Sequence, residues 1–327
     1  MSTANTVTTA AVFNKSIEAA LKRPPALKES IDRILRDVSK LPDEKLYISN
    51  RRQDVIFYTL VDDHQKYQSK KTDEIWHLAR RKYLLQLVEI LKLTDTASHR
   101  GIQKRQALIR DLQKMVASFE RGNLDIFRIT LTDNQYRWLT SHFEQKRINP
   151  AKALQTVSGL YVRSKSERDI LNAYEDWAVP YHYEERQFIF VKPLVDKLEE
   201  ELQEMGFRSG QLYTFGSYDA RWNVPPELEV INARGSIWRS YYPPKGTIKI
   251  FNDIKTMFAD GSFFIHEHEG MMNMFGYRLS ASERASVMKF TGTVDNAHFL
   301  ETYEHDIDTR EKVSNIIKSN ILPRLWF

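Results

Sequence analysis

The chain has 327 residues and no cysteine, 42% of its residues are apolar, and its formal net charge is +5. This length predicts about two domains, and the missing cysteines exclude disulfides, thiolate catalysis and cysteine-ligated zinc. No run of about 18 apolar residues is present, and the polar segment 1–10 lacks the apolar centre of a signal peptide. We therefore expect a cytoplasmic protein with no membrane partner.

The N-terminal region is expected to be mostly helical, because apolar residues recur every three to four positions through most of it. The predicted helices cover 12–38, interrupted at Pro24 and Pro25, then 72–91 with Thr72 as N-cap, 100–121 and 133–146. Residues 45–69 break this pattern with short β-rich runs divided by turn residues, which predicts a small antiparallel meander.

The remaining chain alternates between the helical spacing of apolar residues, every three to four positions, and short β-rich runs. Helices are predicted over 164–177, 193–205, 280–290 and 310–320, and strands over 181–185, 187–191, 247–254, 262–269 and 299–303. Residues 207–246 are rich in Gly, Pro, Trp and Tyr without a clear period, and we interpret them as an insertion. This order predicts an α/β or α+β fold with a central sheet, with a basic helical region over 1–155 and an α/β domain over 156–327.

A run of ionisable residues, His266 to Glu269, ends the predicted strand 262–269. Strand alternation places Glu267 and Glu269 on one face and both histidines on the other. Two buried carboxylates this close repel each other unless they have a partner, and Mg²⁺ or Mn²⁺ prefers oxygen ligands. With Asp253 on the preceding strand as a third ligand, the pattern predicts a metal site. The alternative is a surface or salt-bridged cluster.

The histidines allow a different interpretation. His266 and His268 on one strand face would suit zinc, with His182 or His298 as a third ligand. Either histidine could instead be a hydrogen-bonded core residue, and the oxygen ligands on the opposite face favour Mg²⁺ or Mn²⁺.

Several motifs together resemble a family of bacterial proteins in the PD-(D/E)XK nuclease superfamily. They are Val162–Glu167, Val179–Glu184, Asn252–Ile254 and His266–Met272, with Tyr277, Lys289 and Thr302–Glu304 later in the chain and Leu41–Ser49 and Lys66–Tyr67 before them. The sequence departs from the pattern at Asn252, Ile254 and His266, and it has Glu269 where the superfamily usually has a lysine.

The resemblance implies a restriction-endonuclease-like fold, in which a central mixed sheet is flanked by helices, and a metal-dependent phosphodiesterase. It implies that Asp253 and Glu267 are metal ligands and that Glu269 is a ligand or orients the attacking water. Glu167 would join the site or only cap its helix. His268 would act as general acid or phosphate contact, and Lys289 could replace the missing lysine in space.

Charge is divided unevenly along the chain. Residues 1–160 have a balance of +10, whereas residues 161–327 have a balance of −5. A basic region beside an acidic metal site suits a polyanionic substrate, although the same asymmetry is produced by a solvated surface. The predicted nucleic-acid contacts are Arg163, Lys165, Lys70, Lys71, Arg80 and Arg81.

The sequence thus predicts a magnesium- or manganese-dependent nuclease that cleaves DNA or, alternatively, RNA. It is compatible with a homo-oligomer. The main alternative is a catalytically degenerate nuclease fold that binds nucleic acid or another partner.

Overall fold

The structure is a computed structural model that describes residues 8–22, 27–52, 54–70, 72–190, 229–231, 237–239, 247–270 and 298–327. Several sequence-based expectations lie outside these residues. They include the helix interruption at Pro24 and Pro25, the helices over 193–205 and 280–290, most of the insertion 207–246, the motif residue Tyr277, and the candidate site residues Lys71 and Lys289.

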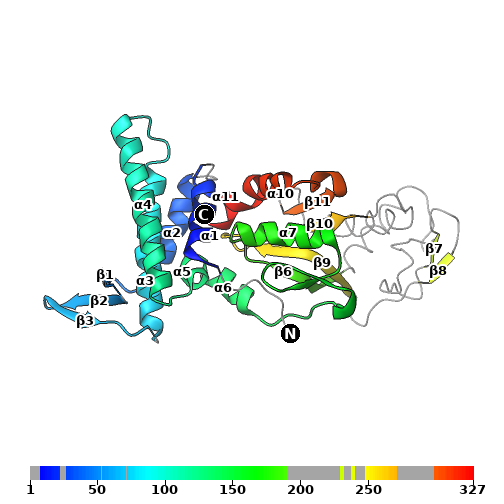
Figure 1. The fold of residues 1–327 in the computed structure, drawn as a ribbon, viewed down its shortest axis with the longest axis horizontal. Coiled ribbons are helices and arrows are strands. Elements are labelled where there is room, and N and C mark those ends of the chain that lie inside the picture. The colour runs from blue at the N-terminus through cyan, green and yellow to red at the C-terminus, as the bar shows by residue number, and fades with distance from the viewer. Residues whose placement is uncertain are drawn as a thin grey trace.

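The N-terminal region forms the predicted helices and meander (Figure 1). Its helices are α1 (Ala10–Ala20), α2 (Leu27–Val38), α3 (Asp73–Lys92), α4 (His99–Arg121), α5 (Ile126–Thr130) and α6 (Asp133–Thr140). Thr72 precedes α3 as predicted. The last helix is shorter than expected, because Ser141 has an extended backbone and Gln145 forms a β-bridge with Glu185.

The meander consists of β1 (Tyr47–Asn50), β2 (Val55–Val61) and β3 (His64–Tyr67), paired antiparallel in that order. Asp62 and Asp63 connect β2 to β3 with positive φ angles of 49° and 62°. Aspartate tolerates this conformation, and a two-residue loop with both φ angles positive matches the twist of the hairpin strands. The predicted meander is therefore confirmed.

A mixed four-stranded sheet forms the second part of the molecule. Its strands are β6 (His182–Phe190), β9 (Thr247–Met257), β10 (Phe263–Glu269) and β11 (Phe299–Tyr303), in the order β11-β10-β9-β6. The pairs β6–β9 and β9–β10 are antiparallel, whereas β10 and β11 are parallel. The two strands predicted over 181–191 are a single strand. The mixed α/β class predicted from the sequence is confirmed at this level.

Helix α7 (Lys165–Asp176) lies beside this sheet (Figure 1). Its inward residues include Ile170, Leu171 and Tyr174, which are all fully buried. The Tyr174 hydroxyl lies 3.0 Å from Nδ1 of His266 on β10, so the helix is tied directly to the strand that carries the ionisable run.

The remaining elements are short. They are η1 (Pro150–Lys152), β4 (Leu154–Gln155), β5 (Tyr161–Val162), β7 (Glu229–Ile231), β8 (Ile237–Arg239), η2 (Glu304–Asp306), α10 (Arg310–Ile316), η3 (Ile317–Ile321) and α11 (Leu322–Leu325). The predicted helix 310–320 is α10 followed by the short π-helix η3.

One cluster of buried apolar residues extends from α1 to Phe327, across the predicted domain boundary. The Trp326 ring packs edge-on against Phe13 at 5.0 Å, and its Nε1 donates to Ser16 Oγ at 2.9 Å. Gln135 Nε2 donates to the carbonyls of Met257 and Leu325. The two halves therefore share a core.

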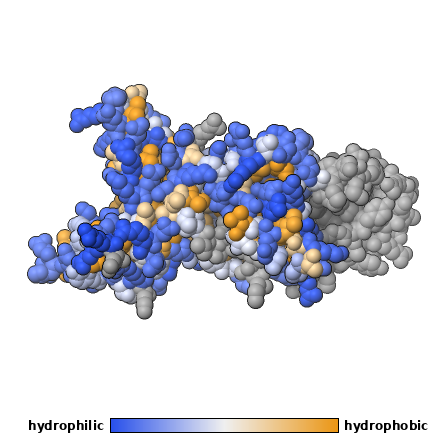
Figure 2. Space-filling view, in the orientation of Figure 1, coloured by the Kyte–Doolittle hydropathy of each residue, from blue (hydrophilic) through white to orange (hydrophobic). Residues whose placement is uncertain are grey.

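The visible surface of the described residues is largely hydrophilic, with apolar residues in small separate groups (Figure 2). No helix among these residues is both long and apolar enough to cross a membrane.

Candidate metal centre

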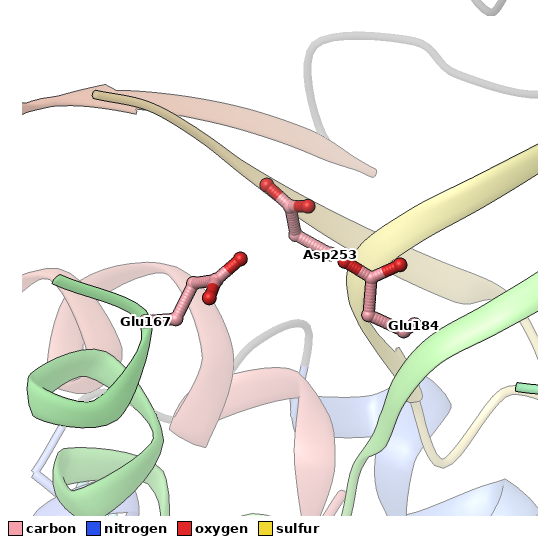
Figure 3. A group of neighbouring side chains, drawn as sticks. All are labelled: Glu167, Glu184 and Asp253. Atoms are coloured by element: carbon pink, nitrogen blue, oxygen red, sulfur yellow. The ribbon is translucent and has the colours of Figure 1, made fainter. Parts of the chain in front are cut away.

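Three buried carboxylates converge beside the sheet (Figure 3). They belong to Glu167 on α7, Glu184 on β6 and Asp253 on β9. One oxygen of each lies within 4.8 Å of an oxygen of the other two. We call these three residues the carboxylate triad.

Glu167 is fixed by the start of its helix. Ser164 is the N-cap of α7 and forms a capping box with Glu167, whose Oε2 accepts the N–H groups of Ser164 at 2.8 Å and Arg163 at 3.0 Å. The box satisfies N–H groups that a helix start leaves without intrahelical partners. Glu167 Oε1 lies 3.0 Å from the Arg163 guanidinium within the triad. Glu167 therefore caps its helix and also belongs to the carboxylate triad.

Glu184 reaches the triad through an unusual backbone conformation. Its φ angle is +54°, and the flanking pairs Tyr183–Ile254 and Glu185–Asn252 place it opposite Asp253. The Tyr183 hydroxyl contacts the backbone of Arg163 beside α7, whereas Glu185 binds His182 on the other side of the sheet. The left-handed conformation of Glu184 thus interrupts strand alternation. As a result, the consecutive side chains of Tyr183 and Glu184 both point toward α7.

Asp253 is held by backbone and side-chain contacts from β10. Its Oδ2 accepts the His268 N–H at 2.9 Å, and its own N–H donates to Glu267 Oε1 at 3.0 Å. Glu267 is buried and lies beside the triad, where it supports the backbone of Asp253. Asp253 and Glu267 were predicted to be joint metal ligands; the structure links them by this hydrogen bond, and Glu267 is not a member of the triad.

The Arg163 guanidinium lies among the three carboxylates. Its Nη2 is 3.0 Å from Glu167 Oε1 and 3.3 Å from Asp253 Oδ1, and it also contacts Glu184 Oε1. Burial opposes ionisation of this group, but the surrounding carboxylates raise the pKa of Arg163 above its ordinary value. With 37% of its side chain exposed, Arg163 enters the triad from the surface.

Burial raises the pKa of Glu184 to about 7, and the nearby Asp253 charge adds to this effect although Arg163 opposes it. Among the described residues, neither Glu184 oxygen accepts a hydrogen bond, although both are buried and one contacts Arg163. A carboxylate so placed favours either a proton or a closely bound cation.

The histidines of β10 lie on one strand face, as alternation predicts, and both contact Thr302 Oγ1. His266 uses both ring nitrogens, for Tyr174 and Thr302, and burial lowers the pKa of His266 to about 3. It is therefore a neutral core residue. His268 Nδ1 lies 3.2 Å from Thr302 Oγ1, and its Nε2 is 3.7 Å from Glu304 Oε1.

The other two histidines considered for zinc lie elsewhere. His182 is stacked between Trp138 and Phe143, and His298 Nε2 lies 2.7 Å from an Arg324 nitrogen. Within the described ranges, the carboxylate triad is the one group of acidic or histidine side chains close enough to hold a metal ion. The four histidines do not assemble a zinc site there.

Glu269 is buried on β10 and paired in register with Tyr303, outside the triad. Lys165 is exposed on the first turn of α7. Lys70 and Arg81 form surface ion pairs with Asp54 and Asp43, each at 2.7 Å.

Arg80 differs from the other predicted nucleic-acid contacts. It is 4% exposed, donates to the Leu131 carbonyl, and lies 3.8 Å from the carboxylates of Asp37 and Asp133. A phosphate would have to displace these contacts, so Arg80 is a structural residue and not a surface contact.

Sequence reasoning assigned no role to Glu184, although it ends the motif Val179–Glu184. A signal was present, because an acidic residue on a strand predicted to share a sheet with Asp253 is a candidate ligand. Strand alternation alone does not reveal it, since the left-handed φ of Glu184 sets its direction.

The chain matches no protein-family model, no curated protein and no solved structure. Its function therefore has to be inferred from the geometry of its own site.

Proposed function

We propose that this protein is a metal-dependent nuclease that hydrolyses phosphodiester bonds, with DNA as the preferred substrate and RNA as the alternative. The observation that carries the proposal is the convergence of three buried carboxylates around a cationic group. The donors are all oxygen atoms, which suits Mg²⁺ or Mn²⁺ better than softer metals.

The residues fit a divalent cation for a second reason. The triad already surrounds a positive charge, the Nη2 of Arg163, at distances of 3.0 Å and 3.3 Å from Glu167 and Asp253. Glu167, Glu184 and Asp253 would hold the metal, and the metal would neutralise the phosphate charge and lower the pKa of a bound water.

The protein's own groups would orient the reactants. The His268 N–H holds Asp253, and the helix cap holds Glu167, so both carboxylates are fixed before a metal or substrate arrives. When the three carboxylates hold a cation, the Arg163 guanidinium would be available for a phosphate oxygen, which it can bind through two parallel hydrogen bonds.

The order of elements supports a restriction-endonuclease-like arrangement as part of this proposal. A helix with an acidic residue in its first turn is followed by three antiparallel strands, and the fourth strand runs parallel to the third. Asp253 lies on the second strand of this series and Glu267 on the third.

The test combines metal binding with cleavage. The wild type should bind Mn²⁺ and cleave plasmid or single-stranded DNA in the presence of Mg²⁺ or Mn²⁺, and a parallel RNA substrate defines the preference. Asp253→Asn should abolish cleavage and weaken Mn²⁺ binding by at least tenfold. Asp169→Asn, a change at a partly exposed carboxylate on the same helix as Glu167 but outside the triad, is the matched control. Equal activity of the Asp253 variant and the wild type would refute the proposal.

A second function is favoured by the same guanidinium. Arg163 already neutralises part of the triad, as expected for a nuclease fold that keeps a structural ion-pair cluster and only binds nucleic acid. This candidate predicts salt-dependent nucleic-acid binding without Mn²⁺ binding or turnover. Calorimetry with Mn²⁺ on the purified protein distinguishes the two functions.

A further inference from the structure

A cavity of about 690 Å³ lies where α1 meets the C-terminal segment η3 and the end of α7. Its volume is within the range of small-molecule pockets. Its charged lining residues are Lys15, Glu18, Lys22 and Lys318, and Trp177 forms part of its wall. We call it the lysine pocket.

The charges of the lysine pocket are unbalanced. Three lysines face one glutamate, and Glu18 accepts a hydrogen bond from Gln113. Within the described part of the chain, no carboxylate forms an ion pair with Lys15, Lys22 or Lys318. A concave surface with uncompensated charge of one sign concentrates the field and attracts ions of the opposite sign.

A fixed aromatic ring keeps two of these charges together. Trp177 is 7% exposed, and its Nε1 donates to Ser314 Oγ at 3.3 Å. The ammonium groups of Lys15 and Lys318 lie 3.9 Å and 5.0 Å from the centre of its ring. Cation–π attraction holds both lysines near the ring although they repel each other, and an anion in the pocket would relieve that repulsion.

Neutral hydrogen-bonding groups complete the pocket. Asn315 and Ser319 carry an amide and a hydroxyl that can donate to anionic oxygens. Several donors around a site with net positive charge suit a group that has several oxygens and more than one negative charge. Phosphate groups have this chemistry.

We propose that the lysine pocket binds phosphate groups of a nucleic-acid strand or of a free nucleotide. Trp177 directly follows α7, ten residues after Glu167, which is about 15 Å along a helix axis at 1.5 Å per residue. A strand held in the pocket could therefore reach the triad within a few nucleotides. The proposal concerns binding alone and does not require that the triad hydrolyse anything.

The test is binding in EDTA, so that metal-dependent cleavage plays no part. The anisotropy of a labelled 20-nucleotide single-stranded DNA is measured at several salt concentrations. Lys22→Gln/Lys318→Gln should bind about tenfold more weakly than the wild type. The slope of log affinity against log salt should fall by about 1.4, because each phosphate that a lysine neutralises on a single strand adds about 0.7 to that slope. The matched control is Lys40→Gln/Lys92→Gln, which removes two exposed lysines outside the pocket.

A variant with the opposite expected effect distinguishes loss of the pocket's charge from a general loss of folding. Glu18→Gln removes the one negative charge of the pocket and should tighten DNA binding several-fold. ATP and inorganic phosphate are titrated in parallel by calorimetry. If ATP binding is lost in the pocket variant while DNA binding is unchanged, the pocket serves free phosphorylated ligands, which also supports the proposal. If the pocket variant equals its control with DNA, ATP and phosphate, the proposal is refuted.

Discussion

Glu184 combines two features that each destabilise a folded chain. Its φ angle of +54° is unfavourable for a side-chain-bearing residue, at a cost of about 1–2 kcal/mol, and its carboxylate is 1% exposed. Strained backbone and buried charge are found together at functional sites, where the surrounding structure holds both in place. In this protein they bring a carboxylate opposite Asp253.

The charge of Glu184 predicts a dependence of stability on pH. Its folded pKa of about 7 lies above the ordinary value of 4.5, so the stabilisation of the protonated form is fully present below about pH 4.5 and is lost as pH rises through 7. Glu184→Gln keeps a neutral side chain at every pH. Without metal it should be more stable than the wild type by about 3 kcal/mol at pH 8, from 1.36 kcal/mol per pKa unit, and equal to it near pH 4.

Urea unfolding of both proteins at several pH values, in EDTA, measures this difference. The exposed variant Glu120→Gln is the control and should follow the wild type at all pH values. With saturating Mn²⁺ at pH 8 the order should reverse, because only the wild type has the third carboxylate. A Glu184 variant less stable than the wild type at pH 8 in EDTA would contradict the raised pKa.

Arg163 and a metal ion compete for one position in this interpretation. Arg163→Gln leaves three carboxylates without their cation and should lower the metal-free free energy of unfolding by about 2–3 kcal/mol, since removing one partner of a buried ion pair leaves uncompensated charge. The same change should raise Mn²⁺ affinity about tenfold and reduce cleavage. Calorimetry and thermal unfolding with and without Mn²⁺ measure both effects.

Arg168→Gln is the matched control, because Arg168 lies on α7, shortly after Arg163 in the chain, and its guanidinium pairs with the adjacent Asp169 and not with the triad. An Arg163→Gln protein that binds Mn²⁺ more weakly than this control would indicate that the guanidinium supports the metal site and does not compete for it.

At the scale of elements, the spacing of apolar residues predicted most helices and strands correctly, because the apolar faces that it defines are the faces that pack into the core. Glu167 caps its helix, which was one of the two roles considered for it, and β10 keeps its alternation. The sequence did not reveal the end of α6 or the role of Glu184. Both depend on long-range pairing of β6. The Gln145–Glu185 bridge pairs β6 with the segment after α6, and the register of β6 with β9 places Glu184 opposite Asp253.

The capping box allows the structural and metal roles of Glu167 to be separated. Glutamine also serves at this position of a capping box, so Glu167→Gln should change the free energy of unfolding in EDTA by less than about 1 kcal/mol while weakening Mn²⁺ binding at least tenfold. Ser164→Ala should have the opposite effect, with a loss of about 1 kcal/mol in stability and a smaller effect on the metal. Ser39→Ala, at an exposed hydroxyl, is the control. Equal Mn²⁺ affinity of Glu167→Gln and the wild type would exclude Glu167 as a ligand.

At the scale of the whole molecule, the two predicted halves share one core. Trp326 contacts Phe13 and Ser16, and Gln135 contacts the carbonyls of Met257 and Leu325. These contacts join the basic N-terminal half to the acidic C-terminal half. The change in net charge near residue 160 therefore does not correspond to a break in packing.

This coupling predicts the effect of a change at one end of the chain on the other. Trp326→Ala should destabilise the protein by about 3–5 kcal/mol through a buried cavity, and amide hydrogen exchange in α1 should accelerate although no residue of α1 is changed. Trp76→Ala, at a half-buried tryptophan on α3, is the control for a general tryptophan effect. Unchanged exchange in α1 would indicate two independently stable units.

The contact between Ser16 and Trp326 also has a consequence in time, because the two residues are 310 positions apart. At a synthesis rate of about 5–20 residues per second, roughly 15–60 s pass between their emergence from a ribosome. During this interval α1 lacks the Trp326 ring that packs against Phe13 in the folded protein, although Tyr83 of α3, another ring in contact with Phe13, is already synthesised. The contact between α1 and the C-terminal segment can therefore form only after nearly the whole chain has been synthesised.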